Sequence, residues 1–186
     1  MSQTRVLALV GSLRTGSVNR QLAETAVSVA ADGTSVTLFE GLGDLPFYNE
    51  DIDVPGATIA GVDELRAAAA QADALLLVTP EYNGTIPAVL KNAIDWISRP
   101  YGAGAVKDKP VAVVSASPSP NGAKWAHDDT RKALGIAGGK LVDAELSIGS
   151  TITKFGEAHP RDNAEIAGQI AELLATLVAA TELVDA

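Results

Sequence analysis

The chain has 186 residues, a length that fits one globular domain. Hydrophobic residues make up 47% of it and aromatic residues only 4%, so its core is aliphatic, as is typical of helices packed on a buried parallel sheet. The chain has no cysteine, which excludes disulfides and thiolate metal sites and fits a reducing compartment. Its net charge of −9 argues against nucleic acid or an anionic membrane as partner, because both attract positively charged surfaces.

The apolar run 6–10 near the N-terminus has the character of a signal peptide's core, but it is too short for one. Residues 11–14 (Gly-Ser-Leu-Arg) then stand where a cleavage region should follow. No other apolar stretch approaches the length of a membrane-spanning helix. We therefore expect a soluble, cytoplasmic protein with no membrane partner.

Short β-branched or leucine-rich runs alternate with longer segments of helical period along the chain. In the first such segment, Val18, Leu22 and Ala26 recur at four-residue steps and predict one buried helix face. The alternation predicts repeated βαβ units, and hence a parallel sheet with helices on both faces. No repeat or linker interrupts it, so we expect a single domain over residues 1–186. The expected strands are 6–10, 35–39, 74–79, 111–115 and 140–146, and the expected helices are 17–31, 61–72, 87–98, 121–134 and 162–183.

A long loop is expected from Gly41 to Gly56, with Pro46, Phe47 and Tyr48 among its residues. Long loops in compact domains are often functional. We interpret this one as a possible rim or contact element.

A glycine- and hydroxyl-rich turn separates the first expected strand from the first helix. Ser12, Thr15 and Ser17 offer hydroxyl groups, and Arg14 offers a cationic fork. The N–H groups and positive dipole end of the new helix point into the same space. This arrangement predicts a phosphate site. The alternative is an ordinary strand–helix turn with Ser17 as helix cap and Arg14 in solvent.

The kind of phosphate is narrowed by what the turn lacks. The spacing Gly11-x4-Gly16 imitates a nucleoside-triphosphate loop, but Ser17-Val18 stands where Lys-Ser/Thr is required. The dinucleotide pattern G-x-G-x-x-G is also absent. A terminal monophosphate fits the remaining donors.

A second unusual loop follows the third expected strand. Pro80 and Gly84 fix its backbone path, so that main-chain groups can meet a flat ring, and Tyr82 and Asn83 can line that ring. The alternative is a tight surface turn with an exposed tyrosine. In a sheet of order 2-1-3-4-5 the first and third strands are neighbours, and ligands bind in the crevice between the loops that follow them. A phosphate loop beside a ring loop matches the shape of FMN.

The two loops resemble those of the NADPH-dependent FMN reductases, a family that includes bacterial quinone- and chromate-reducing members. The family's phosphate loop is similar to G-S-x-R-x-x-S-x-N, which the chain matches from Gly11 to Asn19. Its flavin segment is similar to P-E-Y-N followed by P-x-x-L-K-N-A-I-D-W-x-S-R, matched by residues 80–83 and 87–99. The resemblance extends over residues 6–134. It implies an α/β fold of the flavodoxin-like kind, a three-layer sandwich around a five-stranded parallel sheet of order 2-1-3-4-5.

The resemblance also implies the residues that bind FMN. The first loop would hold its phosphate and ribityl chain, the second would border its isoalloxazine ring, and Ser117 would be a third contact. Related sequences follow this serine with a glycine-rich run, whereas Pro118 and Pro120 stiffen the loop here and put the shape of the nicotinamide and acceptor face in question. The expected cofactor-binding residues are Ser12, Leu13, Arg14, Thr15, Gly16, Ser17, Val18, Asn19, Pro80, Glu81, Tyr82, Asn83, Gly84 and Ser117.

Other conspicuous side chains are given structural roles. We expect Trp96 to serve packing or a subunit contact, and Trp125 and His127 to serve packing or the surface rather than proton transfer. The acid pairs 51/53 and 128/129 have no histidine at ligand spacing, so no metal site is expected. No G-x-S-x-G elbow occurs, which argues against a serine hydrolase.

The resemblance implies an FMN-dependent oxidoreductase that takes hydride from NADPH or NADH at flavin N5. Its acceptor would be a small molecule: a quinone, free flavin, azo compound or metal oxyanion. No catalytic acid or base is assigned, because the flavin carries the chemistry. The alternatives are a flavodoxin-like electron carrier without its own NAD(P)H site and a nucleotide-binding regulatory module. Family members are commonly dimers or tetramers, so a homodimer or homotetramer is expected, with residues 96–99 as a candidate contact.

Overall fold

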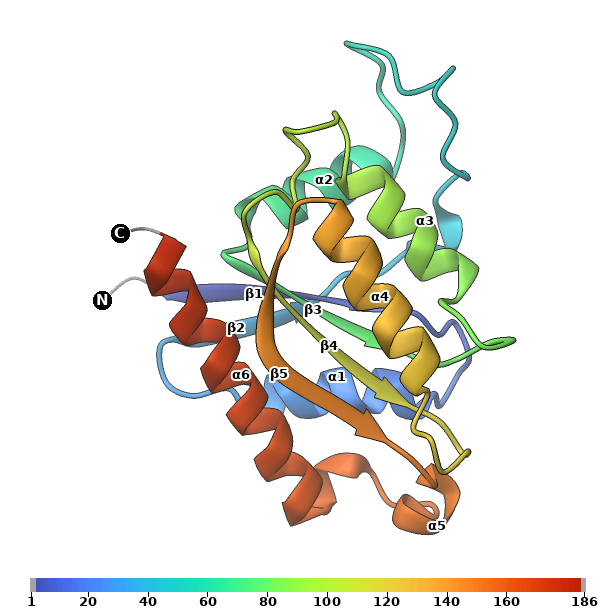
Figure 1. Ribbon diagram of the computed structural model, residues 1–186, viewed down its shortest axis with the longest axis vertical. Helices are drawn as coiled ribbons and strands as arrows, with labels where there is room; N and C mark the ends of the chain where they lie inside the picture. The colour runs from blue at the N-terminus through green and yellow to red at the C-terminus, as the bar shows by residue number, and fades with distance from the viewer. Residues whose placement is uncertain (1–2, 185–186) are drawn as a thin grey trace.

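The computed structural model describes residues 3–184. At its centre is a five-stranded parallel sheet in the order β2-β1-β3-β4-β5 (Figure 1). This confirms the predicted flavodoxin-like α/β fold and its strand order. The strands are β1 (Thr4–Val10), β2 (Thr34–Leu38), β3 (Ala74–Thr79), β4 (Pro110–Ala116) and β5 (Lys140–Ile148).

Helices cover both faces of the sheet. They are α1 (Val18–Val29), α2 (Val62–Gln71), α3 (Ala88–Ile97), α4 (Lys124–Ile136), α5 (Thr151–Phe155) and α6 (Ala164–Val184), with short 3₁₀ helices η1 (Leu42–Asp44) and η2 (Pro160–Asp162). Side chains of α1 and α6 share one core with the sheet, and those of α2, α3 and α4 share the other. The three short helices were not predicted, because segments of three to five residues have no measurable period. Helix α4 begins later than predicted, since Ala123 takes a left-handed conformation (φ 61°) that helical residues do not adopt.

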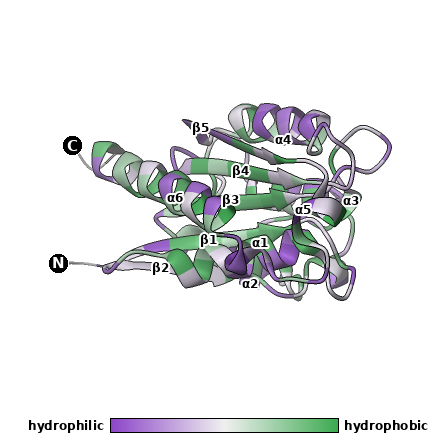
Figure 2. Cartoon of the chain, turned by 90° about the horizontal axis from the view of Figure 1, so that it is seen from below, coloured by the Kyte–Doolittle hydropathy of each residue, from purple (hydrophilic) through white to green (hydrophobic). Residues whose placement is uncertain are grey.

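The central strands are buried on both faces. In β1, the side chains of Val6 and Ala8 lie in the core beneath α1 and α6, and those of Leu7 and Leu9 lie in the opposite core. Two-sided burial explains why these strands are unbroken apolar runs rather than alternating patterns. Figure 2 shows β1 and β3 in the colour of hydrophobic residues.

Helix α6 corrects one expectation from the sequence. Its residues Ala164–Leu183 are long and apolar enough, by length and composition alone, to span a membrane. However, Ile170 and Leu177 are at most 1% exposed and pack in the core shared with α1. The buried residues of α6 thus form one face that packs in this core, whereas most of the helix is not buried.

The loop after β2 is fastened to α3 by three hydrogen bonds. The Pro46 carbonyl accepts from Asn92 Nδ2 at 3.0 Å and from Trp96 Nε1 at 2.8 Å, and the Tyr48 N–H donates to Asn92 Oδ1 at 2.8 Å. Trp96 is completely buried in these contacts. The structure thus supports its predicted packing role and corrects the subunit-contact alternative, because a side chain enclosed by its own chain offers no surface to another.

Candidate functional site

Three loops lie side by side at the carboxyl edge of the sheet. Val10 is in register with Val78, and Thr79 with Ser115, so β1, β3 and β4 end together. The Gly11 N–H donates to the Val78 carbonyl at 2.8 Å and holds the first loop against the second. This edge is the switch point at which ligands bind in sheets of this order.

A cleft of about 610 Å³ opens between these loops, a volume in the range of small-molecule sites. Ten of the fourteen residues predicted to bind the cofactor line it: Ser12, Arg14, Gly16, Ser17, Val18, Asn19, Pro80, Glu81, Tyr82 and Ser117. The other four lie in the same loops. Leu13 and Thr15 line a recess of about 480 Å³ that shares the phosphate loop and reaches Phe39 and Glu40, and Asn83 and Gly84 form the tip of a turn.

The loop after β1 presents free backbone donors to the cleft. Ser17 occupies the N-cap position of α1, but its side chain makes no capping hydrogen bond, and the first turn of α1 holds no acidic residue. The first N–H groups of the helix therefore keep their capacity to bind an anion. Arg14 is exposed at the same end of the cleft. This geometry fits a phosphate group. Two features of the alternative, an ordinary turn, are also found, since Ser17 is at the N-cap position and Arg14 is exposed, but the capping hydrogen bond is absent.

The side chain of Asn19 bears on whether the residues of the cleft fit FMN. Its side-chain Nδ2 donates to the Ala116 carbonyl at 3.1 Å, which fixes the amide orientation. Its Oδ1 is buried and has no hydrogen-bond partner in the described part of the chain. A buried acceptor without a donor costs about 1–3 kcal/mol. The hydroxyl of a polyol can donate to it, whereas an ionised phosphate ester cannot, so Asn19 fits the ribityl chain of FMN rather than its phosphate.

The loop after β3 is a tight turn. The backbones of Tyr82 and Thr85 exchange two hydrogen bonds of 3.3 Å, with Asn83 (φ 53°) and Gly84 (φ 77°) between them. Two successive positive φ angles are what a type I′ turn requires, and Asn-Gly is its preferred pair. The turn places Tyr82 at the cleft with 51% of its surface exposed, which fits a residue that borders a ring and equally the alternative of a tight surface turn with an exposed tyrosine.

The loop after β4 is pinned on its outer side. A Cβ atom on Gly149 would lie only 2.3 Å from the Pro120 carbonyl oxygen, so Pro120 packs closely against the segment after β5. Ser117 and Pro118 face the cleft, whereas Pro120 does not line it. Of the two prolines that distinguish this loop, only Pro118 is placed to affect what enters.

One wall of the cleft escaped the sequence analysis. It comes from the segment after β5 and includes Thr151, Ile152, Phe155 and residues 156–158. These residues belong to no motif, and the family resemblance thins before reaching them. The only available signal was topological, because β5 ends at the same edge as β4.

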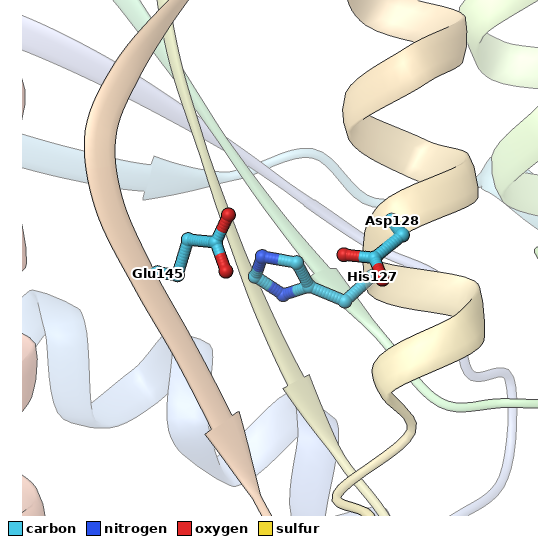
Figure 3. Close-up of side chains that lie close together, drawn as sticks. All are labelled: His127, Asp128 and Glu145. Atoms are coloured by element: carbon cyan, nitrogen blue, oxygen red, sulfur yellow. The ribbon is translucent and has the colours of Figure 1, made fainter.

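A cluster of ionisable groups lies between α4 and β5 (Figure 3). Atoms of His127, Asp128 and Glu145 that can bind metal lie within 4.8 Å of one another, an arrangement that the sequence analysis missed. However, the Lys124 ammonium group contacts both carboxylates, and Arg131 Nε lies 3.4 Å from Glu145. These cations already supply the positive charge that the carboxylates require. Burial lowers the pKa of His127 to about 4, so its ring is neutral at physiological pH.

Comparison with known proteins identifies the family. The family model described as NADPH-dependent FMN reductase matches residues 4–153. The chain belongs to the NADPH-dependent FMN reductase family. It is 45% identical over 138 residues to a quinone reductase of Pseudomonas putida, covering 72% of each chain. It is 41% identical over 130 residues to an NAD(P)H-dependent FMN reductase of Pseudomonas aeruginosa, covering 70% of this chain and 69% of the other.

Solved structures agree with this placement. The flavoenzyme FerB, an NAD(P)H:(acceptor) oxidoreductase from Paracoccus denitrificans, superimposes with a TM-score of 0.79 at 31% identity, over 95% of this chain and 98% of the other. The family confirms the predicted enzyme class, an FMN-dependent NAD(P)H oxidoreductase. It also favours the reductase over the electron carrier and the regulatory module.

Proposed function

We propose that the chain holds FMN in the cleft at the ends of β1, β3 and β4 and reduces quinones with NAD(P)H. The observation that carries the proposal is a single cleft lined both by the uncapped start of α1, with Arg14 beside it, and by the turn after β3. The quinone-reducing relatives support the choice of acceptor.

The phosphate end of FMN would be held by the loop after β1. Arg14 and the hydroxyls of Ser12 and Ser17 lie there, together with the uncapped N–H groups of α1. Charge-assisted bonds from a guanidinium to phosphate are among the strongest that proteins make. Asn19 Oδ1, which has no partner among the described residues, would accept a hydrogen bond from the ribityl chain.

The ring end would be bordered by Pro80, Glu81, Tyr82 and Ser117. FMN, when bound, supplies the chemistry: it accepts a hydride from NAD(P)H and passes electrons to the acceptor. The protein's part is to bind and orient, and we assign no acid or base to any side chain. The rigid type I′ turn keeps Tyr82 in place while nicotinamide and quinone exchange at the open side of the cleft.

Anaerobic reduction tests this function. Protein loaded with FMN should lose its visible absorption when NADH or NADPH is added, and a benzoquinone should restore the absorption with repeated turnover. Tightly bound FMN that neither nicotinamide bleaches within minutes would leave the electron carrier as the better description. Reduction without reoxidation by any quinone would remove quinones as the acceptor class.

We further infer that the chain forms a homodimer or homotetramer. A groove of about 830 Å³ between α3 and α4 supports this, because exposed Tyr101 and Ile136 line it beside Ser98 and Arg99. Light scattering should give a mass of two or four chains, and Ile136→Glu should lower it. A monomeric parent protein would contradict the inference.

We also infer that residues 1–186 act as one FMN-binding domain in the cytoplasm. Both layers of helices pack on the same sheet, which supports a single folding unit. The absence of cysteine and the use of NAD(P)H fit a reducing compartment. Limited proteolysis that released a stable fragment would contradict the single domain, and fractionation of cells would test the location.

A further inference from the structure

Helix α4 starts without a cap of its own. The N-cap position is held by Ala123, whose side chain cannot accept a hydrogen bond. The first turn of α4 also contains no acidic residue. Helix starts leave backbone N–H groups unpaired, and a buried or half-buried start needs an acceptor from elsewhere.

Glu81 provides that acceptor from the ring loop. Its Oε2 accepts hydrogen bonds from the N–H groups of Trp125 at 3.1 Å and Ala126 at 3.3 Å. These are the second and third residues of α4, whose N–H groups a helix's own capping side chain normally satisfies. A carboxylate is also the favoured charge at this end of a helix. Glu81 thus caps α4 across 44 positions of sequence.

Two more contacts fasten the same loop to the same helix. Thr85 Oγ1 donates to Asp129 Oδ2 at 2.6 Å. The indole of Trp125 lies against Gly84, with Cε3 3.6 Å from the position that a Cβ would take there. These contacts and the Glu81 cap therefore hold the turn that borders the cleft against the first two turns of α4.

We propose that Glu81 is a positioning residue that couples occupation of the cleft by the flavin ring to the order of the start of α4. The proposal rests on the proposed function, since it requires FMN to bind against residues 80–84. If the ring binds only when the loop is held in place, the cap strengthens FMN binding. By linkage, bound FMN must then strengthen the cap by the same factor.

The rate of hydrogen exchange at the amides of Trp125 and Ala126 measures how well Glu81 caps α4, and it can be measured with or without flavin. In flavin-free protein, Glu81→Ala should speed this exchange by roughly 5- to 30-fold, the scale of a lost helix cap. Glu81→Gln, which keeps an acceptor oxygen and loses the charge, should restore much of the protection. A matched control is Glu64→Ala, which removes an exposed acid from the first turn of α2 and should leave these amides unchanged.

The coupling is read by repeating the measurement with FMN. Bound FMN should slow exchange at the two amides in the parent protein, and this extra protection should be lost in Glu81→Ala, together with a several-fold weaker Kd for FMN. Equal exchange in the parent and Glu81→Ala without flavin would overturn the cap. FMN bound normally but without effect on these amides would overturn the coupling. If Glu81→Ala speeds exchange at the two amides but the parent protein binds no FMN, the proposed function is wrong, and the coupling with it.

Discussion

Asn19 on α1 donates to the carbonyl of Ala116 at the end of β4, across the floor of the cleft. The bond commits the Nδ2 group, and the other polar atom of the amide, Oδ1, is buried without a partner among the described residues. One side chain therefore links the start of α1 to the end of β4, and we propose that its unpaired oxygen accepts a hydrogen bond from bound FMN.

Replacing Asn19 by alanine should lower the affinity for FMN far more than it lowers the stability of the flavin-free protein. The variant loses one hydrogen bond to Ala116, but it also removes an orphan acceptor, so the two effects partly offset each other without ligand. With FMN bound, the parent should gain about 1–3 kcal/mol that the variant lacks. Thermal unfolding with and without FMN measures both terms. An equal shift on adding FMN to parent and variant would place Oδ1 away from the ligand.

Arg14→Ala should lower FMN affinity by roughly 1.5–3 kcal/mol, the scale of a hydrogen bond to a charged group. The loss should exceed that from Ser12→Ala, because the arginine supplies charge as well as geometry. Riboflavin, which lacks the phosphate, serves as the matched ligand: its weaker binding should be the same in parent and variant. Calorimetric titration gives all the affinities, and an unchanged Kd for FMN would return Arg14 to a solvent role.

The parent protein should bind about one FMN per chain and prefer it to riboflavin and FAD. The phosphate loop offers hydroxyls, one arginine and a helix start, but it lacks the glycine pattern that lets a dinucleotide's pyrophosphate approach. Competition between the three flavins for the apoprotein, followed by fluorescence, measures the preference. Equal affinity for FMN and riboflavin would contradict a loop that recognises phosphate.

Burial of His127 should make stability fall with acidity between about pH 6.5 and pH 4. Its pKa in the folded protein is about 4, below the ordinary 6.5, so the unfolded chain binds a proton first as pH falls through this window. The stabilising effect is complete above pH 6.5 and is lost toward pH 4, at no more than about 1.4 kcal/mol per pH unit. Urea unfolding of the parent and of His127→Leu at several pH values isolates this contribution. Parallel pH profiles for the two proteins would show that His127 is not the group responsible.

The positions of the two loops, after β1 and after β3, could be predicted because their signals are local, whereas their roles toward FMN stay predictions. Asn83-Gly84 specifies a type I′ turn by its two positive φ angles, and the structure has that turn. Relationships between segments far apart in sequence left no such signal. Glu81 caps α4 from 44 positions away, and Glu145 meets His127 only because β5 packs beside α4. The wall around Ile152 was missed for the same reason. Its residues line the cleft because they follow β5 at the same edge of the sheet, and their residue types do not indicate this position.

Pro118 is the residue whose replacement should most directly alter access of nicotinamide to the flavin. It lines the cleft next to Ser117, while Pro120 is packed against Gly149 and does not line the cleft. If the Pro118 ring crowds the nicotinamide, relief of that crowding would be worth about 1–3 kcal/mol. Pro118→Gly should therefore lower the KM for NAD(P)H by roughly tenfold, at the expense of somewhat lower stability because glycine frees the unfolded chain.

Pro120→Ala is the matched control for that change. It relaxes the same loop without touching the cleft lining, so it should alter the midpoint of unfolding and leave the KM for NAD(P)H as it is in the parent. Steady-state kinetics with a fixed benzoquinone and varied NADH or NADPH, together with urea unfolding of all three proteins, separates the two effects. If both variants change KM alike, the stiffness of the whole loop governs nicotinamide access, and the direct role of the Pro118 ring is wrong. If neither does, the nicotinamide approaches from the side of Tyr82, and the loop after β4 contributes only to holding the flavin.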